Sequence, residues 1–282
     1  MTHETGTRTG PDGTELFVRR WTPDRPTRAV LALVHGLHEH SGRYAYLSSA
    51  LMARGIAVRA IDLRGHGQSG GARGQVESFD DYLSDIRPWL DEIIAQADVP
   101  VFLMGHSMGG LVAAATVVDR GTDGLAGVVL SSPALQVDSP PLLRRLAPVV
   151  ARWFPDAPAA RLDLKHLSHD PTVARAYRED PLTIKRGVRA RLGLEILTTS
   201  ERVRQHPEAF DVPLYLFHGT DDRLTDPDGT RWLASHAAGD VTLRIWDGLY
   251  HETMNEPQRD DVIGELADWL DAHIAEPAGP AA

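Results

Sequence analysis

A series of short runs, apolar at consecutive positions or rich in β-branched residues, constrains the fold of this chain more than any other feature. The runs are Leu16–Arg20, Val30–Val34, Ala57–Ile61, Val101–Met104, Gly127–Leu130, Leu214–Phe217 and Val241–Trp246. Stretches with the apolar spacing of a helix lie between them, at Tyr44–Arg54, Ser78–Ala97, Gly109–Arg120, Asp228–Ala237 and Asp260–His273. Runs that are apolar on both faces are typical of parallel strands covered by helices on each side. The alternation predicts an α/β fold with a mostly parallel central sheet and right-handed crossovers.

One interval, residues 138–205, breaks this alternation because it contains helical patterns but no strand candidate. Residues 142–154 place Leu, Val, Trp and Phe side chains on one helical stripe. The interval carries 13 Lys and Arg against 8 Asp and Glu, whereas the whole chain carries 29 against 39. We therefore expect an α/β core formed by residues 1–137 and 206–282, with a helical cap or lid inserted at 138–205.

Composition and charge exclude several classes of protein. The net charge is −10 and no compact basic patch is present, so we expect no nucleic-acid partner. The absence of cysteine excludes disulfides, iron–sulfur clusters, Cys-ligated zinc and a thiol nucleophile. The first residues lack a signal-peptide pattern, and no apolar run approaches the ~18 residues of a transmembrane helix. These features predict a cytoplasmic protein.

The pentapeptide Gly105-His106-Ser107-Met108-Gly109 lies between a predicted strand and a predicted helix. A G-x-S-x-G pattern in this context is typical of a nucleophile elbow, a sharp turn that exposes the serine. The turn leaves no room for a Cβ two residues before or after the serine, and we expect a strained backbone at Ser107. The alternative is a small-residue turn that only packs the helix against the strand. The strand–turn–helix context favours Ser107 as a nucleophile.

A serine nucleophile needs a general base and an acid that orients this base. In proteins that have a nucleophile elbow, the catalytic residues occur along the chain in the order serine, acid, histidine. Three candidates for the acid follow the run Leu214–Phe217, and spacing alone does not separate them: Asp221, Asp222 and Asp226. The candidate base is His251, because it lies on a loop after the last predicted strand, whereas His236 and His273 lie on predicted helices.

Two backbone N–H groups are expected to stabilise the oxyanion of an acyl-transfer reaction. One comes from Met108, the residue after the serine, and the other from the loop that follows Val30–Val34. Within that loop, Leu37 is our candidate.

Two alternative interpretations receive less support. The segment Gly65–Gly70 matches the G-x-G-x-x-G fingerprint of dinucleotide-binding proteins, but no helix is predicted to open there for the pyrophosphate. His35, His38 and His40 could form a metal cluster, but no HExxH helix accompanies them. We therefore expect neither a metal nor an organic cofactor.

Several longer stretches carry a family resemblance: His35–Tyr44, Asp62–Ser69, Gly105–Gly110, Tyr177–Leu182, His218–Leu224 and Tyr250–Glu252. Together they resemble the monoacylglycerol lipases of the α/β-hydrolase superfamily, from about Val30 to the last predicted helix. The serine pentapeptide is shared across the superfamily. The stretches His35–Tyr44 and Tyr177–Leu182 are more specific to the monoacylglycerol lipases than the pentapeptide is.

The resemblance implies Asp222 as the acid of the triad. It also implies a polar pocket for the glycerol head group and a cap whose apolar helices admit the acyl chain. The residues implied to line the head-group pocket are Glu39, Arg43, His106 and Tyr177. The sequence departs from the family at His38, where glycine is frequent, and at Met254, where a polar residue could contact the leaving group.

The resemblance implies a serine carboxylester hydrolase that cleaves monoacylglycerols to glycerol and fatty acid through an acyl-enzyme. Alternatives on the same triad are a lysophospholipase, a short- or medium-chain carboxylesterase and a peptidase. A ligand-binding protein with little turnover is a further alternative. The apolar stripe at 142–154, flanked by arginines, predicts either packing against the core or transient contact with a lipid interface.

Overall fold

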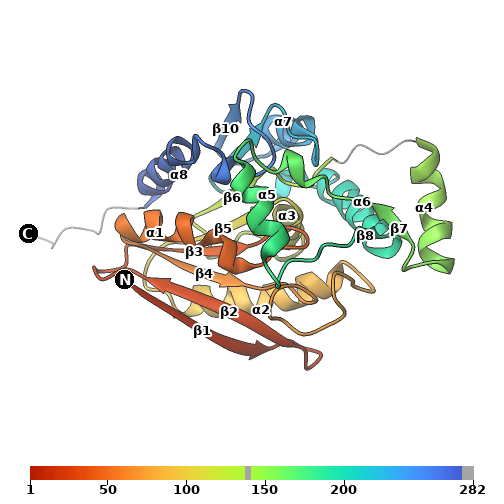
Figure 1. Cartoon of the computed structure of the whole chain (residues 1–282). Coiled ribbons are helices and arrows are strands. Elements are labelled where there is room, and N and C mark those ends of the chain that lie inside the picture. The colour runs from red at the N-terminus through yellow and green to blue at the C-terminus, as the bar shows by residue number, and fades with distance from the viewer. Residues whose placement is uncertain (137–140, 275–282) are drawn as a thin grey trace, which may run out of the picture.

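The computed structural model describes residues 1–136 and 141–274 and contains an eight-stranded sheet (Figure 1). The strand order is β1-β2-β4-β3-β5-β6-β9-β10. The strands are β1 (Thr2–Thr9), β2 (Glu15–Thr22), β3 (Ala29–Val34), β4 (Ile56–Ile61), β5 (Val101–His106), β6 (Gly127–Ser131), β9 (Leu214–Gly219) and β10 (Val241–Trp246). Strands β4 to β10 of this order pair in parallel, whereas β2 is antiparallel to β4 and to β1. The predicted α/β fold is confirmed.

Helices cover both faces of the sheet, and each face carries its own apolar core. Side chains of α2, α3 and α7 pack on one face, and those of α1 and α8 pack on the other. These helices are α1 (Ala45–Ala53), α2 (Asp80–Gln96), α3 (Met108–Arg120), α7 (Pro227–His236) and α8 (Arg259–His273). Because the strands between them are buried on both faces, their sequences read as continuous apolar runs.

Strand β1 was not predicted from the sequence. It lies at the edge of the sheet, pairs only with β2 among the described strands, and is exposed along almost its whole length. An exposed edge strand needs no apolar face, so the sequence of Thr2–Thr9 is polar and lacks the pattern of a strand.

The segment between β6 and β9 forms an insert of mixed structure. It contains α4 (Pro141–Trp153), β7 (Pro158–Ala160), α5 (Pro171–Glu179), β8 (Val188–Arg189) and α6 (Ala190–Arg204). The insert also contains single-turn 3-10 helices at Leu164–His166 and Pro207–Ala209. Outside the insert, single-turn 3-10 helices lie at Ser41–Tyr44 and Thr253–Asn255. The expectation that this interval lacks strands was wrong, because β7 and β8 pair antiparallel. Strands of two or three residues are too short to show a hydrophobic period. The expected boundary between residues 137 and 138 lies outside the described residues.

Helix α4 lies at the periphery of the molecule, where it contacts α6 (Figure 1). Its described apolar side chains are largely exposed: Leu146 46%, Val149 57%, Val150 38%, Trp153 69% and, just beyond the helix, Phe154 68%. Leu142 and Leu143 of the predicted stripe lie outside the residues whose side chains are described. Within residues 1–136 and 141–274, no helix is both long and apolar enough to cross a bilayer.

Candidate active site

Ser107 lies on a sharp turn between β5 and α3. Its backbone has φ 56° and ψ −121°, a left-handed conformation that costs energy for any residue with a Cβ. The flanking glycines are required by space: a Cβ on Gly105 would lie 2.2 Å from the carbonyl oxygen of Gly109, and one on Gly109 would lie 2.2 Å from that of His35. The turn therefore has the steric constraints predicted from the pentapeptide, and it places the serine side chain at the carboxyl end of the sheet.

His251 lies between Ser107 and Asp222. Its Nε2 atom is 2.9 Å from Ser107 Oγ, and its Nδ1 atom is 2.7 Å from Asp222 Oδ2. All three residues occupy loops or turns at the carboxyl ends of β5, β9 and β10. The structure thus brings together the three predicted side chains. Asp221 and Asp226, the other acidic candidates, point elsewhere: Asp221 is exposed, and Asp226 caps α7.

The carboxylate of Asp222 is buried and accepts several hydrogen bonds. Besides His251, the backbone N–H groups of Leu224 and Thr225 donate to Oδ1, at 2.7 and 3.1 Å. His218 Nε2 lies 2.8 Å from Oδ2, the same oxygen that His251 contacts. Burial alone would raise the pKa of Asp222, but His251 and His218 outweigh it and hold this pKa far below its usual range. The acid therefore stays ionised.

His218 is a residue of the site that the sequence did not single out. It lies at the end of β9, its side chain is fully buried, and its Nδ1 atom is 2.7 Å from the Thr230 hydroxyl oxygen. Burial lowers the pKa of His218, against the influence of Asp222. The sequence placed it at the start of the family stretch His218–Leu224 and four residues before Asp222, but neither observation gave it a role.

The two histidines nearest to Ser107 differ in their electrostatics. Burial alone would lower the pKa of His251, but the charge of Asp222 and the hydrogen bond to it outweigh burial and raise this pKa above its usual value. Burial and the neighbouring His251 lower the pKa of His106 to about 4, so His106 is neutral at physiological pH. The ring of His106 lies 4.8 Å from that of His251, between centroids. His251 is therefore the better proton acceptor of the pair.

The predicted oxyanion donors lie on two segments that meet at Ser107. Met108 is the first residue of α3, so its N–H has no partner within the helix. Leu37 lies in the loop after β3, and Gly36 in the same loop donates its N–H to Glu39 Oε1 at 2.6 Å. Among the described residues, neither Leu37 nor Met108 donates its backbone N–H to another backbone group. Both groups are available to a bound oxyanion.

His38, one of the two departures from the family pattern, has a left-handed backbone with φ 62°. Glycine adopts this conformation without strain, which explains why glycine suits the position. The His38 carbonyl accepts hydrogen bonds from Ile184 N–H and the Tyr177 hydroxyl, both at 2.9 Å. Burial, together with the charge of Arg186 nearby, lowers the pKa of His38 to about 4. Contacts from the insert thus hold the strained residue in place.

Glu39 and Arg43 belong to a buried ion network rather than to an open pocket. Arg43 donates to Glu39 at 2.5 Å and to both carboxylate oxygens of Glu252 at 2.7 and 2.8 Å. Tyr44 donates its hydroxyl to Glu39 at 2.7 Å. A small cavity lies beside this network and is lined in part by Met254. Its volume is about 20 Å³, enough for one water molecule. The network joins the oxyanion loop to the residue after His251.

His106 and Tyr177 lie on either side of this network. His106 Nδ1 is 3.0 Å from the Ser131 hydroxyl, and its ring lines the small cavity. The ring of Tyr177 lies under the Arg43 guanidinium, with 5.2 Å from its carbon to the ring centroid. The four residues implied for the head group are therefore clustered, and their contact with a substrate stays a prediction.

The insert contacts both loops of the site through backbone hydrogen bonds. The N–H groups of His251 and Glu252 donate to the carbonyls of His166 and Leu167, at 3.3 and 2.8 Å. On the other side, Ile184 and Tyr177 bind the His38 carbonyl. Residues 164–184 therefore form a wall of the site.

Two of the three histidines of the alternative metal cluster have separate side-chain partners, whereas the ring nitrogens of His38 have no hydrogen-bond partner among the described residues. His35 Nε2 accepts the N–H of Leu63, and His40 Nε2 lies 2.8 Å from Asp180. Within residues 1–136 and 141–274, no group of three or more His, Cys, Asp or Glu side chains could hold a metal ion. The glycine-rich segment Gly65–Gly70 is followed by a loop, and the next helix begins only at Asp80.

A mostly parallel sheet with helices on both faces, and a serine on a strained turn beside a histidine and a carboxylate, define a serine hydrolase of the α/β-hydrolase class. The family model described as serine aminopeptidase S33 matches residues 25–258.

Comparison with known proteins narrows the class. The chain is 34% identical to the monoacylglycerol lipase of Mycolicibacterium smegmatis, over 94% of this chain and 96% of that protein. It is also 34% identical to phospholipase YtpA of Bacillus subtilis, over 90% of this chain and 99% of that protein. The crystal structure of the Paleococcus ferrophilus monoacylglycerol lipase superposes with a TM-score of 0.81 at 35% identity, covering 92% of this chain and 99% of that one. The chain belongs to the α/β-hydrolase family that contains these monoacylglycerol lipases.

Proposed function

We propose that this protein hydrolyses monoacylglycerols, with Ser107 as nucleophile, His251 as general base and Asp222 as the acid that orients it. The observation that carries the proposal is the position of His251, 2.9 Å from Ser107 Oγ and 2.7 Å from Asp222 Oδ2. The monoacylglycerol lipases of Mycolicibacterium smegmatis and Paleococcus ferrophilus, at 34% and 35% identity, support the substrate class.

Each step of the proposed reaction uses groups of this chain. Ser107 Oγ attacks the ester carbonyl while His251 Nε2 takes its proton, and the charge of Asp222 stabilises the imidazolium. The oxyanion lies against the N–H groups of Met108 and Leu37, each worth about 10²–10³ in kcat. His251 then gives its proton to the departing glycerol oxygen, and a water molecule releases the fatty acid from the acyl-enzyme by the same route.

We propose that residues 138–205 act as a cap over the acyl chain, and that the glycerol head group lies toward Glu39, Arg43, His106 and Tyr177. The wall formed by residues 164–184 supports the first part of this proposal. The clustering of the four polar residues next to His251 supports the second.

The test is glycerol release from a medium-chain monoacylglycerol, measured beside the matching di- and triacylglycerol and a short aryl ester. The Ser107→Ala variant provides the blank. We expect fast turnover of the monoacylglycerol, little on the bulkier lipids, and none above background in the variant. Activity on the aryl ester alone would refute the substrate class and leave the proposed triad intact. Wild-type activity in Ser107→Ala would refute the mechanism.

A phospholipase or lysophospholipase activity is a second candidate, favoured by the 34% identity to the Bacillus subtilis phospholipase. The same triad serves both reactions, since the scissile bond is a carboxylic ester in each. Fatty acid release from a lysophospholipid that equals release from the monoacylglycerol would favour this candidate.

We also propose that α4 contacts lipid interfaces. Its exposed apolar side chains include Trp153 and Phe154, 69% and 68% exposed, with Arg152 beside them. An exposed apolar stripe with flanking arginines is suited to an anionic lipid surface. Binding to phosphatidylglycerol vesicles should weaken about tenfold in a Trp153→Ser/Phe154→Ser variant, while turnover of a short, water-soluble ester stays unchanged. Equal vesicle binding of variant and wild type would refute the contact.

A further inference from the structure

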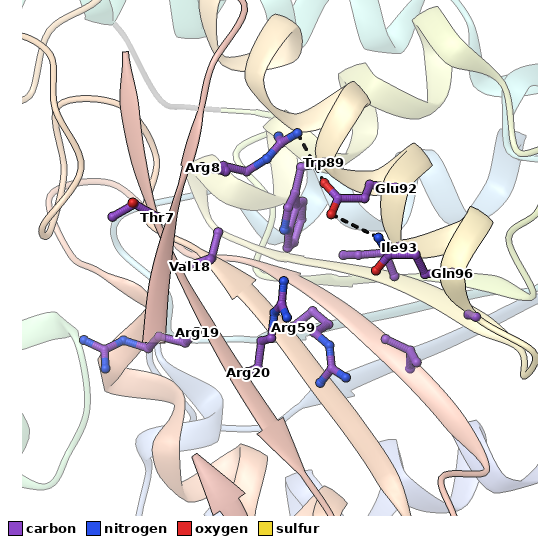
Figure 2. Close-up of a pocket in the computed structure, with 12 residues that line it drawn as sticks. Thr7, Arg8, Val18, Arg19, Arg20, Arg59, Trp89, Glu92, Ile93 and Gln96 are labelled. Carbon is purple, nitrogen blue, oxygen red and sulfur yellow. Dashed lines mark hydrogen bonds and ion pairs between the residues drawn. The ribbon is translucent and has the colours of Figure 1, made fainter. Parts of the chain in front are cut away.

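A second cavity, away from Ser107, lies between the first strands of the sheet and α2 (Figure 2). Its volume is about 240 Å³, well above the ~10–15 Å³ that a cavity needs to hold one water molecule. The apolar part of its lining comes from Val18, Val30, Trp89 and Ile93. None of the residues that line it belongs to the catalytic site described above.

Four arginines line this cavity: Arg8 on β1, Arg19 and Arg20 on β2, and Arg59 on β4. The Arg19 side chain donates to Ser41 and points away from the other lining residues (Figure 2). The one carboxylate in the lining, Glu92, is already occupied (Figure 2). It pairs with Arg8 at 3.6 Å and accepts a hydrogen bond from Gln96 at 3.2 Å. Among the described ion pairs within 4.0 Å, none involves Arg20 or Arg59. The cavity therefore carries two positive charges without a close counter-charge.

Strand pairing places these two charges side by side. Arg20 lies directly opposite Arg59 in the β2–β4 ladder, and like charges at opposite positions destabilise a sheet. Glu4 lies opposite Arg20 on β1, but its carboxylate is not within ion-pair distance of Arg20. Arg59 donates hydrogen bonds to neutral acceptors at 3.3–3.5 Å, namely the carbonyls of Trp21 and Val58 and the hydroxyl of Thr22. Burial and the charge of Arg20 lower the pKa of Arg59, with Glu4 acting in the opposite direction.

We propose that this cavity binds a small amphiphilic anion, with a carboxylate or phosphate monoester head between Arg20 and Arg59 and a short apolar chain along Trp89 and Ile93. Arginine suits both heads because its planar guanidinium donates two parallel hydrogen bonds. Trp89 is 5% exposed, and Val18, Val30 and Ile93 line the same cavity, which suits the apolar chain of the ligand. The volume of about 240 Å³ leaves room for a head group with a short chain.

Isothermal titration calorimetry with hexanoate, hexyl phosphate and inorganic phosphate tests the proposal. The variants are Arg20→Gln and Arg59→Gln, and the matched control is Arg231→Gln, which removes an exposed arginine paired with Asp228 on α7. We expect hexanoate or hexyl phosphate to bind, with a Kd at least tenfold weaker in both cavity variants and unchanged in the control. Preference for one of the two ligands identifies the head group.

Thermal unfolding without ligand provides a second readout. Removal of one of two repelling charges should leave Tm unchanged or raise it, whereas the loss of a merely structural arginine would lower it. A lowered Tm in Arg20→Gln therefore counts against the site. Absence of binding at millimolar concentration, binding of inorganic phosphate alone, or equal binding by an Arg20→Gln/Arg59→Gln variant would overturn the proposal.

Discussion

Glu39 offers a test that separates two roles for one buried carboxylate. It accepts hydrogen bonds from Gly36 N–H at 2.6 Å, from Tyr44 and from Arg43. The Glu39→Gln variant keeps one oxygen for Gly36 but turns an NH₂ group toward the Arg43 guanidinium. One charge-assisted hydrogen bond, worth about 1.5–3 kcal/mol, is lost. Because Glu252 still neutralises Arg43, the loss stays below the ~3–5 kcal/mol of an isolated buried charge.

We therefore expect Glu39→Gln to lower the free energy of unfolding by about 2 kcal/mol. Each kcal/mol lost should lower Tm by roughly 2–4 °C. Because Gly36 precedes Leu37, the oxyanion donor should move with it. A misplacement of about 1 Å can cost 10²-fold in rate. We expect kcat to fall about tenfold in Glu39→Gln and about 100-fold in Glu39→Ala, which leaves Gly36 without an acceptor.

The assay compares a monoacylglycerol with a short aryl ester that has no glycerol head group. If Glu39 holds the oxyanion loop, kcat falls by the same factor for both substrates, and KM changes little. The control is Glu208→Gln, whose carboxylate side chain is 69% exposed and lies far from the ion network in the sequence. A normal kcat on the aryl ester, together with lost activity on the monoacylglycerol, would refute the positioning role and assign Glu39 to the head group alone.

Three further predictions concern the triad and the oxyanion loop. Asp222→Asn should lower kcat by about 10⁴, as the same change does in a serine protease, and a loss below tenfold in steady-state assays would contradict its role. Because the raised pKa of His251 keeps it protonated to higher pH, kcat/KM should rise with pH through a midpoint above 6.5; a midpoint below 6.5 would contradict the Asp222–His251 pair. Leu37→Pro removes the N–H and should reduce kcat about 100-fold, whereas Leu37→Ala should cost little; equal losses would disprove the oxyanion assignment.

The sequence predicted most of the core because the core strands are buried on both faces. Runs such as Val30–Val34 and Val101–Met104 contain no polar residues, so they cannot be mistaken for loops. The strands of the structure are longer than these runs by only one or two residues. Strand β1 escaped prediction because its stability comes from pairing with β2 along its whole length rather than from burial. Such pairing leaves no trace in the local sequence.

The candidate site divides in a similar way. The turn at Ser107 was predictable because local steric constraints require glycine on both sides of the serine. The bond between Arg43 and Glu252 joins residues 209 positions apart, and the contact of His218 with Asp222 depends on the orientation of both side chains. Neither follows from spacing, so the interactions that orient the site became visible only in the folded chain.

The hydrogen bonds between the insert and the two loops of the site have a consequence for how such enzymes diversify. The carbonyls of residues 166 and 167 accept hydrogen bonds from the backbone N–H groups of His251 and Glu252. Tyr177 and Ile184 donate hydrogen bonds to the His38 carbonyl. We therefore expect changes in this inner part of the insert to alter the rate as well as the choice of substrate. Helix α4 lies outside this contact and meets α6 instead. If α4 forms the lipid contact proposed above, its exchange between relatives varies the lipid surface that is recognised and leaves the proposed proton transfer at Ser107 unchanged.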